Sequence, residues 1–173
     1  MDQGGPMLTD PHPGDTAPAA ALDVVLAVTG LEAATAADAL DVLAARLRAM
    51  DAVDTDFPAA LRDREATYPT GLATPVPTAI PHAEPQHVRT SGLVVATLAA
   101  PVPFGAMGGQ GENVAAELIA MPLLADARAH LRALQALMGL LRDEEAVRDL
   151  LAAGDDTELA SRAASRLRGG SAA

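Results

Sequence analysis

The segment from residue 64 to residue 87 constrains the fold of this chain more than any other, because it is rich in proline. It contains Pro69, Pro75, Pro77, Pro81 and Pro85. Proline fixes φ and has no backbone N–H to donate, so the segment can be neither a continuous helix nor a central strand. We therefore predict a loop with one short strand at residues 78–80. Loops held on a scaffold often carry function, and we expect this loop to position His82.

The composition limits the class of protein. The 173 residues suffice for one domain, and because half are hydrophobic but only 2% aromatic, the core must consist of Ala, Leu, Val and Ile. A net charge of −11 argues against a nucleic-acid partner. The absence of cysteine excludes disulfides, thiolate metal sites and cysteine nucleophiles. No apolar run approaches the roughly 20 residues of a membrane span, and the N-terminus does not resemble a signal peptide. We expect a cytoplasmic protein without direct membrane insertion.

Hydrophobic patterning predicts strands and helices in mixed order, which indicates an α/β or α+β protein. We predict strands at residues 22–28, 91–99 and 114–121. Helices are predicted at residues 35–50, about 54–66, 125–141, 143–153 and 156–168, the first capped by Thr35 and the fourth by Asp143. Pro101 and Pro103 restrict the residues after the second strand to an edge or a turn, and we predict a turn at 104–109. Residues 1–19 and 169–173 are predicted to be disordered tails around a single domain at 20–168.

Two charged or titratable side chains lie beside predicted apolar helix faces. Arg64 continues the face of the second helix, either as a solvated residue whose stem covers apolar surface or as a guanidinium that grips a phosphate. His130 lies in the first turns of the helix at 125–141, where a positive helix end favours an anion. That helix is predicted to bury four apolar residues against the sheet: Leu131, Leu134, Met138 and Leu141.

Four roles are open for His82. A metal site would use His82, Glu84 and His87, but the intervening prolines forbid the helical zinc motif and no cysteine is present, so we expect neither a metal nor a cofactor. A serine hydrolase lacks its G-x-S-x-G motif. A loop histidine is also commonly a surface residue without chemistry. Alternatively, a neutral imidazole can accept a phosphoryl group, with Arg64, His87, His130 and backbone N–H groups as suitable donors around it.

The order R-E-x-x-x-P-T-G-L, A-I-P-H, a strand, P-V-x-F, a second strand and H-L-x-x-L on a helix resembles a known family. It is that of the type-2 EIIA domain of the bacterial phosphoenolpyruvate:sugar phosphotransferase system, the fructose/mannitol family. The resemblance covers residues 20–165 approximately. Among subtypes, the sequence around Tyr68, the position of His87 and the turn at Met107 look most like the galactitol-type branch.

The resemblance implies a three-layer α/β/α sandwich on a mixed sheet of about five strands. His82 matches the histidine that accepts a phosphoryl group from phospho-HPr and passes it to a cysteine of the EIIB partner. Arg64 matches an arginine near that site, and His130 matches a second histidine of mannitol-type members. Glu65 and Thr70 belong to the same motif and are accessory candidates, as is His87, which lies outside the wider catalytic pattern.

The resemblance therefore implies a phosphocarrier in sugar uptake, which meets the membrane EIIC only indirectly. Because this chain has no cysteine, its EIIB partner must be separate. An apolar patch around the loop would meet HPr-like donors, with Leu72, Val76 and Met107 as candidates. The alternative is a regulatory module of the same fold, which binds and controls a transporter, kinase or transcription factor.

Overall fold

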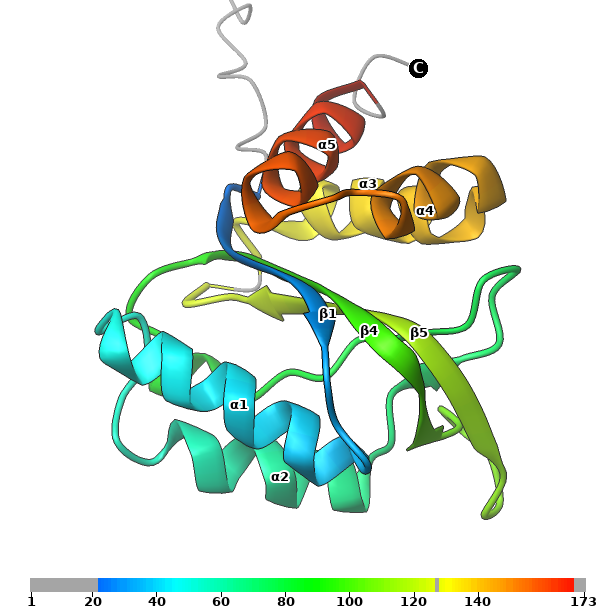
Figure 1. The fold of residues 1–173 in the computed structure, drawn as a ribbon. Helices are drawn as coiled ribbons and strands as arrows, with labels where there is room; N and C mark the ends of the chain where they lie inside the picture. The colour runs from blue at the N-terminus through cyan, green and yellow to red at the C-terminus, as the bar shows by residue number, and fades with distance from the viewer. Residues whose placement is uncertain (1–21, 127, 170–173) are drawn as a thin grey trace, which may run out of the picture.

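A five-stranded mixed sheet of order β1–β4–β5–β3–β2 organises the computed structural model, which describes residues 22–126 and 128–169 (Figure 1). The strands are β1 (Val24–Leu31), β2 (Gly71–Leu72), β3 (Thr78–Ala79), β4 (Gly92–Gly105) and β5 (Asn113–Leu123). β1 runs parallel to β4 and β3 parallel to β5, whereas the β4–β5 and β2–β3 pairs are antiparallel.

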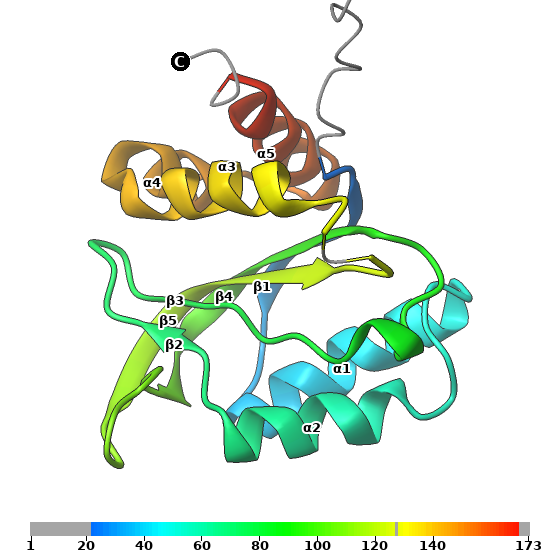
Figure 2. The same ribbon diagram turned by 180° about the vertical axis from the view of Figure 1, so that it is seen from behind.

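Helices cover both faces of this sheet. They are α1 (Ala36–Ala49), α2 (Phe57–Thr67), α3 (Leu131–Arg142), α4 (Glu144–Leu151) and α5 (Asp156–Gly169), with a short 3-10 helix, η1 (Pro85–His87). α1 and α2 lie on one side of the sheet, and α3, α4 and α5 lie on the other (Figures 1 and 2). The predicted three-layer α/β/α sandwich on a mixed five-stranded sheet is therefore confirmed.

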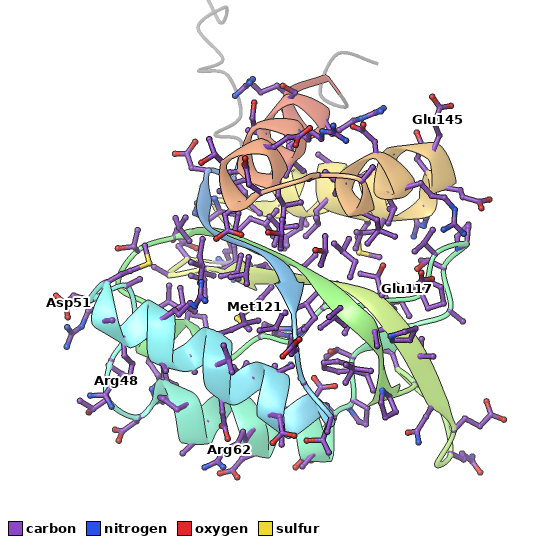
Figure 3. The ribbon with its side chains drawn as sticks, in the orientation of Figure 1. Arg48, Asp51, Arg62, Glu117, Met121 and Glu145 are labelled. Atoms are coloured by element: carbon purple, nitrogen blue, oxygen red, sulfur yellow. The ribbon has the colours of Figure 1, made fainter. Side chains whose placement is uncertain are left out.

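The two helical layers pack on separate cores that share the central strands. Successive side chains of a strand point to opposite faces, so Val94 packs toward α1 and α2 while its neighbour Val95 packs toward α3, α4 and α5. Because both faces are covered, β4 and β5 are apolar at consecutive positions rather than alternate ones. Figure 3 shows Met121 of β5 inside the molecule, whereas Arg48 and Arg62 point outward from α1 and α2.

The predicted helix caps at Thr35 and Asp143 are confirmed. Each side chain accepts a hydrogen bond from the backbone N–H three residues later, at 3.1 Å in both cases, which satisfies a donor that the helix leaves unpaired. The first strand was predicted two residues too early and too short, since β1 ends at Leu31. The second helix begins at Phe57, with Pro58 in its first turn, later than the predicted start at residue 54.

β4 is longer than predicted, because it continues through Pro101 and Pro103 to Gly105. A register shift between Thr97 and Val102 interrupts its ladder with β5. β1 ends opposite Leu98, so one side of β4 is an edge from there on, and an edge tolerates residues that cannot donate. The expectation of an edge was correct, whereas the turn predicted at 104–109 begins too early.

α3 begins at Leu131 rather than at residue 125, so His130 is the residue before the helix and not within its first turns. The reason is local: the carboxylate of Asp126 accepts hydrogen bonds from the N–H groups of Arg128 and Ala129, which favours a turn over a helix. The predicted stripe was only partly correct: Leu141 is buried and Met138 packs against the core, but Leu131 is 59% exposed. The buried residues of α3 are Ala133, Leu137, Leu140 and Leu141.

The proline-rich segment holds more regular structure than predicted. α2 extends to Thr67, and two-residue strands, β2 and β3, replace the single expected piece. Gly71 of β2 lies so close to β4 that a Cβ atom there would come within 2.7 Å of the Gly105 carbonyl oxygen. This contact requires glycine and holds the loop against the end of β4.

The predicted tail at 1–19 and residues 170–173 of the other tail lie outside the described residues, while Gly169 belongs to α5. The domain limits 20–168 stay a prediction. None of the helices in the described ranges combines the length and apolarity that a bilayer crossing demands.

Asp156, at the start of α5, fastens that helix to β1. Its carboxylate accepts hydrogen bonds from the backbone N–H of Thr29 at 2.7 Å and from the Thr29 hydroxyl at 2.8 Å. These two bonds, the backbone one first, hold the pKa of Asp156 below its ordinary value of 3.8. A carboxyl group with a lowered folded-state pKa stabilises the fold above its unfolded-state pKa, and that contribution is lost as the pH falls through the folded-state value.

We therefore expect Asp156→Ala to lower the free energy of unfolding at pH 7 by about 1 kcal/mol, since solvent screens an exposed carboxylate. The difference from the unsubstituted protein should shrink below about pH 4. Urea unfolding at several pH values measures both. Asp63→Ala is the control, because Asp63 is exposed on α2 and makes no side-chain hydrogen bond among the described residues. An equal, pH-independent loss in both variants would contradict this account.

Candidate functional site

His82 follows β3 by three residues and lies at the edge of the sheet where β5 also ends. β3 and β5 are parallel, with Ala79 opposite Ile119, so continuing this register would bring His82 level with Pro122. The preceding residue, Pro81, is buried, and His82 itself is half-buried. The imidazole thus lies in the loop just after a short strand of the sheet, partly accessible to solvent.

The imidazole of His82 is fixed by its own backbone. Its Nδ1 lies 2.9 Å from the carbonyl oxygen of Ile80. A carbonyl oxygen can only accept, so Nδ1 carries the proton and donates it. In the neutral ring, Nε2 then bears the lone pair and is the nucleophilic atom.

Glu65 and Thr70 form a buried pair beneath the loop. One oxygen of the Glu65 carboxylate accepts from the Thr70 N–H at 2.9 Å, and the other accepts from the Thr70 hydroxyl at 2.8 Å. Burial raises the pKa of Glu65, although these two bonds and the opposite charge of a protonated His82 reduce the rise.

Arg64 is turned toward the loop rather than lying free in solvent. It forms an ion pair with Glu84, two residues after His82, and its guanidinium carbon lies 5.7 Å from the centre of the Tyr68 ring. Its Nε is buried and has no acceptor among the described residues. An unpaired buried donor is costly, so this nitrogen is suited to an anion that binds at the site.

His130 shares this property with Arg64. Its Nδ1 is buried without a hydrogen-bond partner in the part of the chain that the structure describes. His130 follows the carboxyl end of β5, while His82 follows that of β3, and parallel strands bring such ends to one edge of the sheet. Both of the unpaired buried side-chain atoms found in the described ranges therefore belong to residues that the sequence indicated for the site.

His87 has a different environment. Its Nδ1 lies 3.0 and 3.1 Å from the two carboxylate oxygens of Asp54, and its carbonyl accepts from the Asp54 N–H at 3.0 Å. Burial alone would raise the pKa of Asp54, but the hydrogen bond and charge of His87 outweigh it and lower that pKa. These contacts anchor η1 to the segment before α2. They are the contacts of a structural residue, and they leave no free Nδ1 for chemistry.

Sequence reasoning missed two partners of the site. Glu84 was considered only as a metal ligand, yet it pairs with Arg64, and the spacing of 20 residues gave no signal for this. Tyr68 is 65% exposed beside Arg64. Within the ranges described, no three His, Asp or Glu side chains gather as a metal site would require.

The expected apolar patch is only partly correct. Val76 is fully buried in the core with α3, α4 and α5, so it cannot meet a partner, and Leu72 is half-buried. Met107 is 47% exposed, and its N–H donates to the Gly71 carbonyl at 2.8 Å, which keeps it beside the loop. Met107 and Tyr68 are therefore the exposed apolar side chains that flank the loop.

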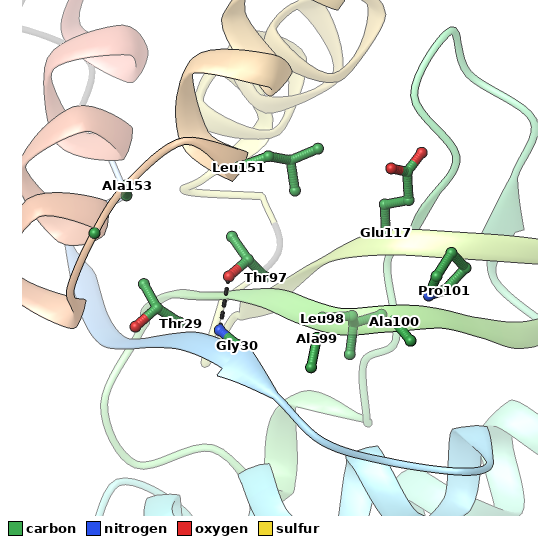
Figure 4. A pocket seen from close by; sticks show the side chains of 11 residues that line it. Thr29, Gly30, Thr97, Leu98, Ala99, Ala100, Pro101, Glu117, Leu151 and Ala153 are labelled. Carbon is green, nitrogen blue, oxygen red and sulfur yellow. Dashed lines mark hydrogen bonds between the residues drawn. The ribbon is translucent and has the colours of Figure 1, made fainter.

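A cavity of about 540 Å³ lies elsewhere, where β1, β4 and the α4–α5 connection meet (Figure 4). Glu117 is its only charged lining residue, and the hydroxyl of Thr97 already accepts from the N–H of Gly30 at 2.9 Å. None of the residues indicated by the sequence lines it. We therefore place the candidate site at His82 and not in this cavity.

Solved structures similar to this chain include phosphotransferase-system IIA proteins. The Streptococcus mutans protein PtxA, described as a PTS IIA, is 19% identical over 84% of this chain and 91% of its own, with a TM-score of 0.68. The mannitol-specific cryptic phosphotransferase enzyme IIA CmtB of Escherichia coli is 26% identical over 83% and 92%, with a TM-score of 0.63.

The IIA mannitol enzyme of Escherichia coli, solved in complex with phosphorylated IIB, is 23% identical to this chain. The match covers 81% of this chain and 92% of that one, with a TM-score of 0.63. At such identities the first and third likenesses establish the fold alone. No curated protein matches the chain, and the galactitol-type assignment stays a prediction.

A family model establishes the identity. The model described as "Phosphoenolpyruvate-dependent sugar phosphotransferase system, EIIA 2" matches residues 21–162. This range contains all five strands, the loop with His82 and every helix except the end of α5. The chain therefore belongs to the EIIA 2 family of the phosphoenolpyruvate-dependent sugar phosphotransferase system.

Proposed function

We propose that the protein is a phosphocarrier whose His82 accepts a phosphoryl group from phospho-HPr and passes it to a cysteine of a separate EIIB protein. One observation carries the proposal: the hydrogen bond from Nδ1 of His82 to the Ile80 carbonyl, which leaves Nε2 as the free nucleophile. The membrane EIIC would be reached only through EIIB, and the transfers would take place in the cytoplasm.

The chemistry needs no proton transfer at Nε2. Its lone pair forms a bond to phosphorus as the bond between phosphorus and the donor atom of phospho-HPr breaks. The donor atom keeps that electron pair. The ring of His82 becomes a phosphoimidazolium that retains its Nδ1 proton, hydrogen-bonded to Ile80. In the second transfer, the thiolate sulfur of the EIIB cysteine bonds to phosphorus, and the pair returns to Nε2.

Arg64 and His130 are suited to stabilise the transferred group. Charge spreads over three phosphoryl oxygens during transfer, and positioned donors lower the barrier. The Nε of Arg64 is buried without an acceptor among the described residues. Its Nη1 pairs with Glu84, which a phosphoryl group would replace as the anion. The unpaired Nδ1 of His130 supplies a further donor when protonated there.

The partner is proposed from the family and from the surface. The Escherichia coli IIA mannitol enzyme forms a complex with phosphorylated IIB. This chain has no cysteine, so the acceptor cysteine lies outside it. Tyr68 and Met107 flank the loop and are exposed, which suits an apolar contact with a partner.

We expect the protein to gain one acid-labile phosphoryl group on His82 when it is incubated with phosphoenolpyruvate, enzyme I and HPr. Intact mass measures the gain, and His82→Ala should show none. A His82→Ala protein that still gained a phosphoryl group would remove the central claim. A protein that is phosphorylated but passes nothing to any EIIB would favour the regulatory alternative.

Arg64→Ala should slow phosphoryl transfer about 10²- to 10³-fold, the loss typical of removing one donor to a developing charge. Its melting temperature should change little, because the ion pair with Glu84 is partly exposed to solvent. Arg62→Ala is the matched control on the same helix, since its one ion pair within the described ranges is with Asp41 at the surface. Equal transfer rates with a lowered melting temperature would make Arg64 structural instead.

His130 and His87 should respond in opposite ways. His130→Ala should slow transfer and leave the melting temperature nearly unchanged, because its buried Nδ1 has no protein partner to lose among the described residues. His87→Ala should lower the melting temperature without slowing transfer, because it removes the contact with Asp54. Rapid-quench transfer assays and thermal melts of both variants measure these effects. The reverse pattern would make His130 the structural residue and His87 the one that takes part in transfer.

A further inference from the structure

A chain of hydrogen bonds connects Glu65 to the imidazole of His82. The Glu65 carboxylate accepts from both the N–H and the hydroxyl of Thr70. The carbonyl of Thr70 in turn accepts from the N–H of Ile80 at 3.2 Å. The carbonyl of Ile80 accepts from Nδ1 of His82 at 2.9 Å. Three successive links thus run from the last turn of α2, through the backbone of the loop, to the ring.

This chain passes through the rigid part of the loop. Thr70 is 3% exposed and Glu65 is 8% exposed, so solvent does not compete strongly for their bonds. The next residue, Gly71, pairs with Ala79 in the β2–β3 ladder, so both strands of the loop are held in register on either side of the chain. Each link enters a residue at its N–H and leaves at its C=O, on either side of the Cα atom, so the links act by fixing the position of the Ile80 carbonyl relative to the ring.

We propose that Glu65 is a positioning residue for His82, which acts through Thr70 and Ile80 to keep the His82 proton on Nδ1 and the ring oriented. The proposal rests on the proposed phosphoryl transfer at His82 and deepens it. Glu65 touches neither the phosphoryl group nor its donor. Its effect reaches Nε2 because the peptide group of Ile80 decides which ring nitrogen carries the proton.

Binding the N–H of Thr70 just after α2 does not by itself explain why residue 65 is acidic. An ionised carboxylate loses much of its hydration when it is buried, and a neutral acceptor could cap the Thr70 N–H at a lower cost. A negative charge at Glu65 becomes favourable when the His82 ring acquires a positive charge, which happens when the phosphoimidazolium forms. The buried charge of Glu65 would then stabilise phosphorylated His82 relative to the free ring.

Two variants separate charge from hydrogen bonding. Glu65→Gln keeps the size of the side chain and one acceptor for Thr70 but removes the charge, and Thr70→Ala removes only the hydroxyl link. Thr70→Ser restores the hydroxyl and should behave as the unsubstituted protein does. Glu145→Gln, on the exposed surface of α4, is the control for the loss of one carboxylate (Figure 3).

The first measurement does not need phosphoryl transfer. Nitrogen-15 NMR of the ring nitrogens, assigned with His82→Ala, reports the tautomer of His82 in the free protein. We expect the Nδ1–H form in the unsubstituted protein, and a mixture with the Nε2–H form in Glu65→Gln and Thr70→Ala. The second measurement is transfer from phospho-HPr, which should slow by about 10- to 100-fold in Glu65→Gln, the range seen when groups that orient a reacting ligand are removed.

The outcomes are distinguishable. If Glu65→Gln keeps the same tautomer and the same transfer rate in a folded protein, the positioning role is wrong although the proposed function stands. If the unsubstituted protein takes no phosphoryl group at all, the proposed function fails, while the tautomer measurement still tests the link from Glu65 to His82. Thermal melts identify a variant that does not fold, and Thr70→Ala, the milder change, then decides the outcome.

Discussion

The site depends on a parallel pairing of only two residues on each strand. Thr78 and Ala79 of β3 lie against Leu118 and Ile119 of β5, and both β3 residues are completely buried. The residues around His82 depend on this pairing, since β2 pairs with β3, and Thr70 and His82 bind the backbone of Ile80 just beyond it. A strand this short is stable only because the sheet encloses it on both edges.

The last turn of α2 serves the site with two neighbouring side chains of opposite charge. Consecutive residues of a helix point about 100° apart, so Arg64 and Glu65 cannot face the same way. Arg64 reaches outward to Glu84 near the surface, while Glu65 turns inward to Thr70. One helix end thereby supplies a cation, proposed to bind the phosphoryl oxygens, and a buried anion beneath the loop.

Much of this arrangement follows from sequence, but only where the signal is local. Periodicity predicted mixed strands and helices, capping chemistry predicted the caps at Thr35 and Asp143, and prolines predicted the loop with His82. The three-layer arrangement followed from the family resemblance. The start of α3 was not predictable, because the Asp126 side chain competes for the backbone N–H groups that would begin the helix. The contact of His87 with Asp54, 33 residues away, was also not predictable, because neither periodicity nor composition indicates such long-range pairs.

Pro101 and Pro103 limit the hydrogen bonding of β4 and thereby protect its open edge. Both are exposed on β4 beyond the point where β1 ends, while Val102 and Phe104 between and after them are buried. The open side of such a strand is a template on which a second chain can add its own backbone, the route to edge-to-edge aggregation. Proline offers an incoming strand no N–H. For the proposed phosphocarrier, which would meet and leave its partners repeatedly, an edge of this kind would disfavour permanent association through β4.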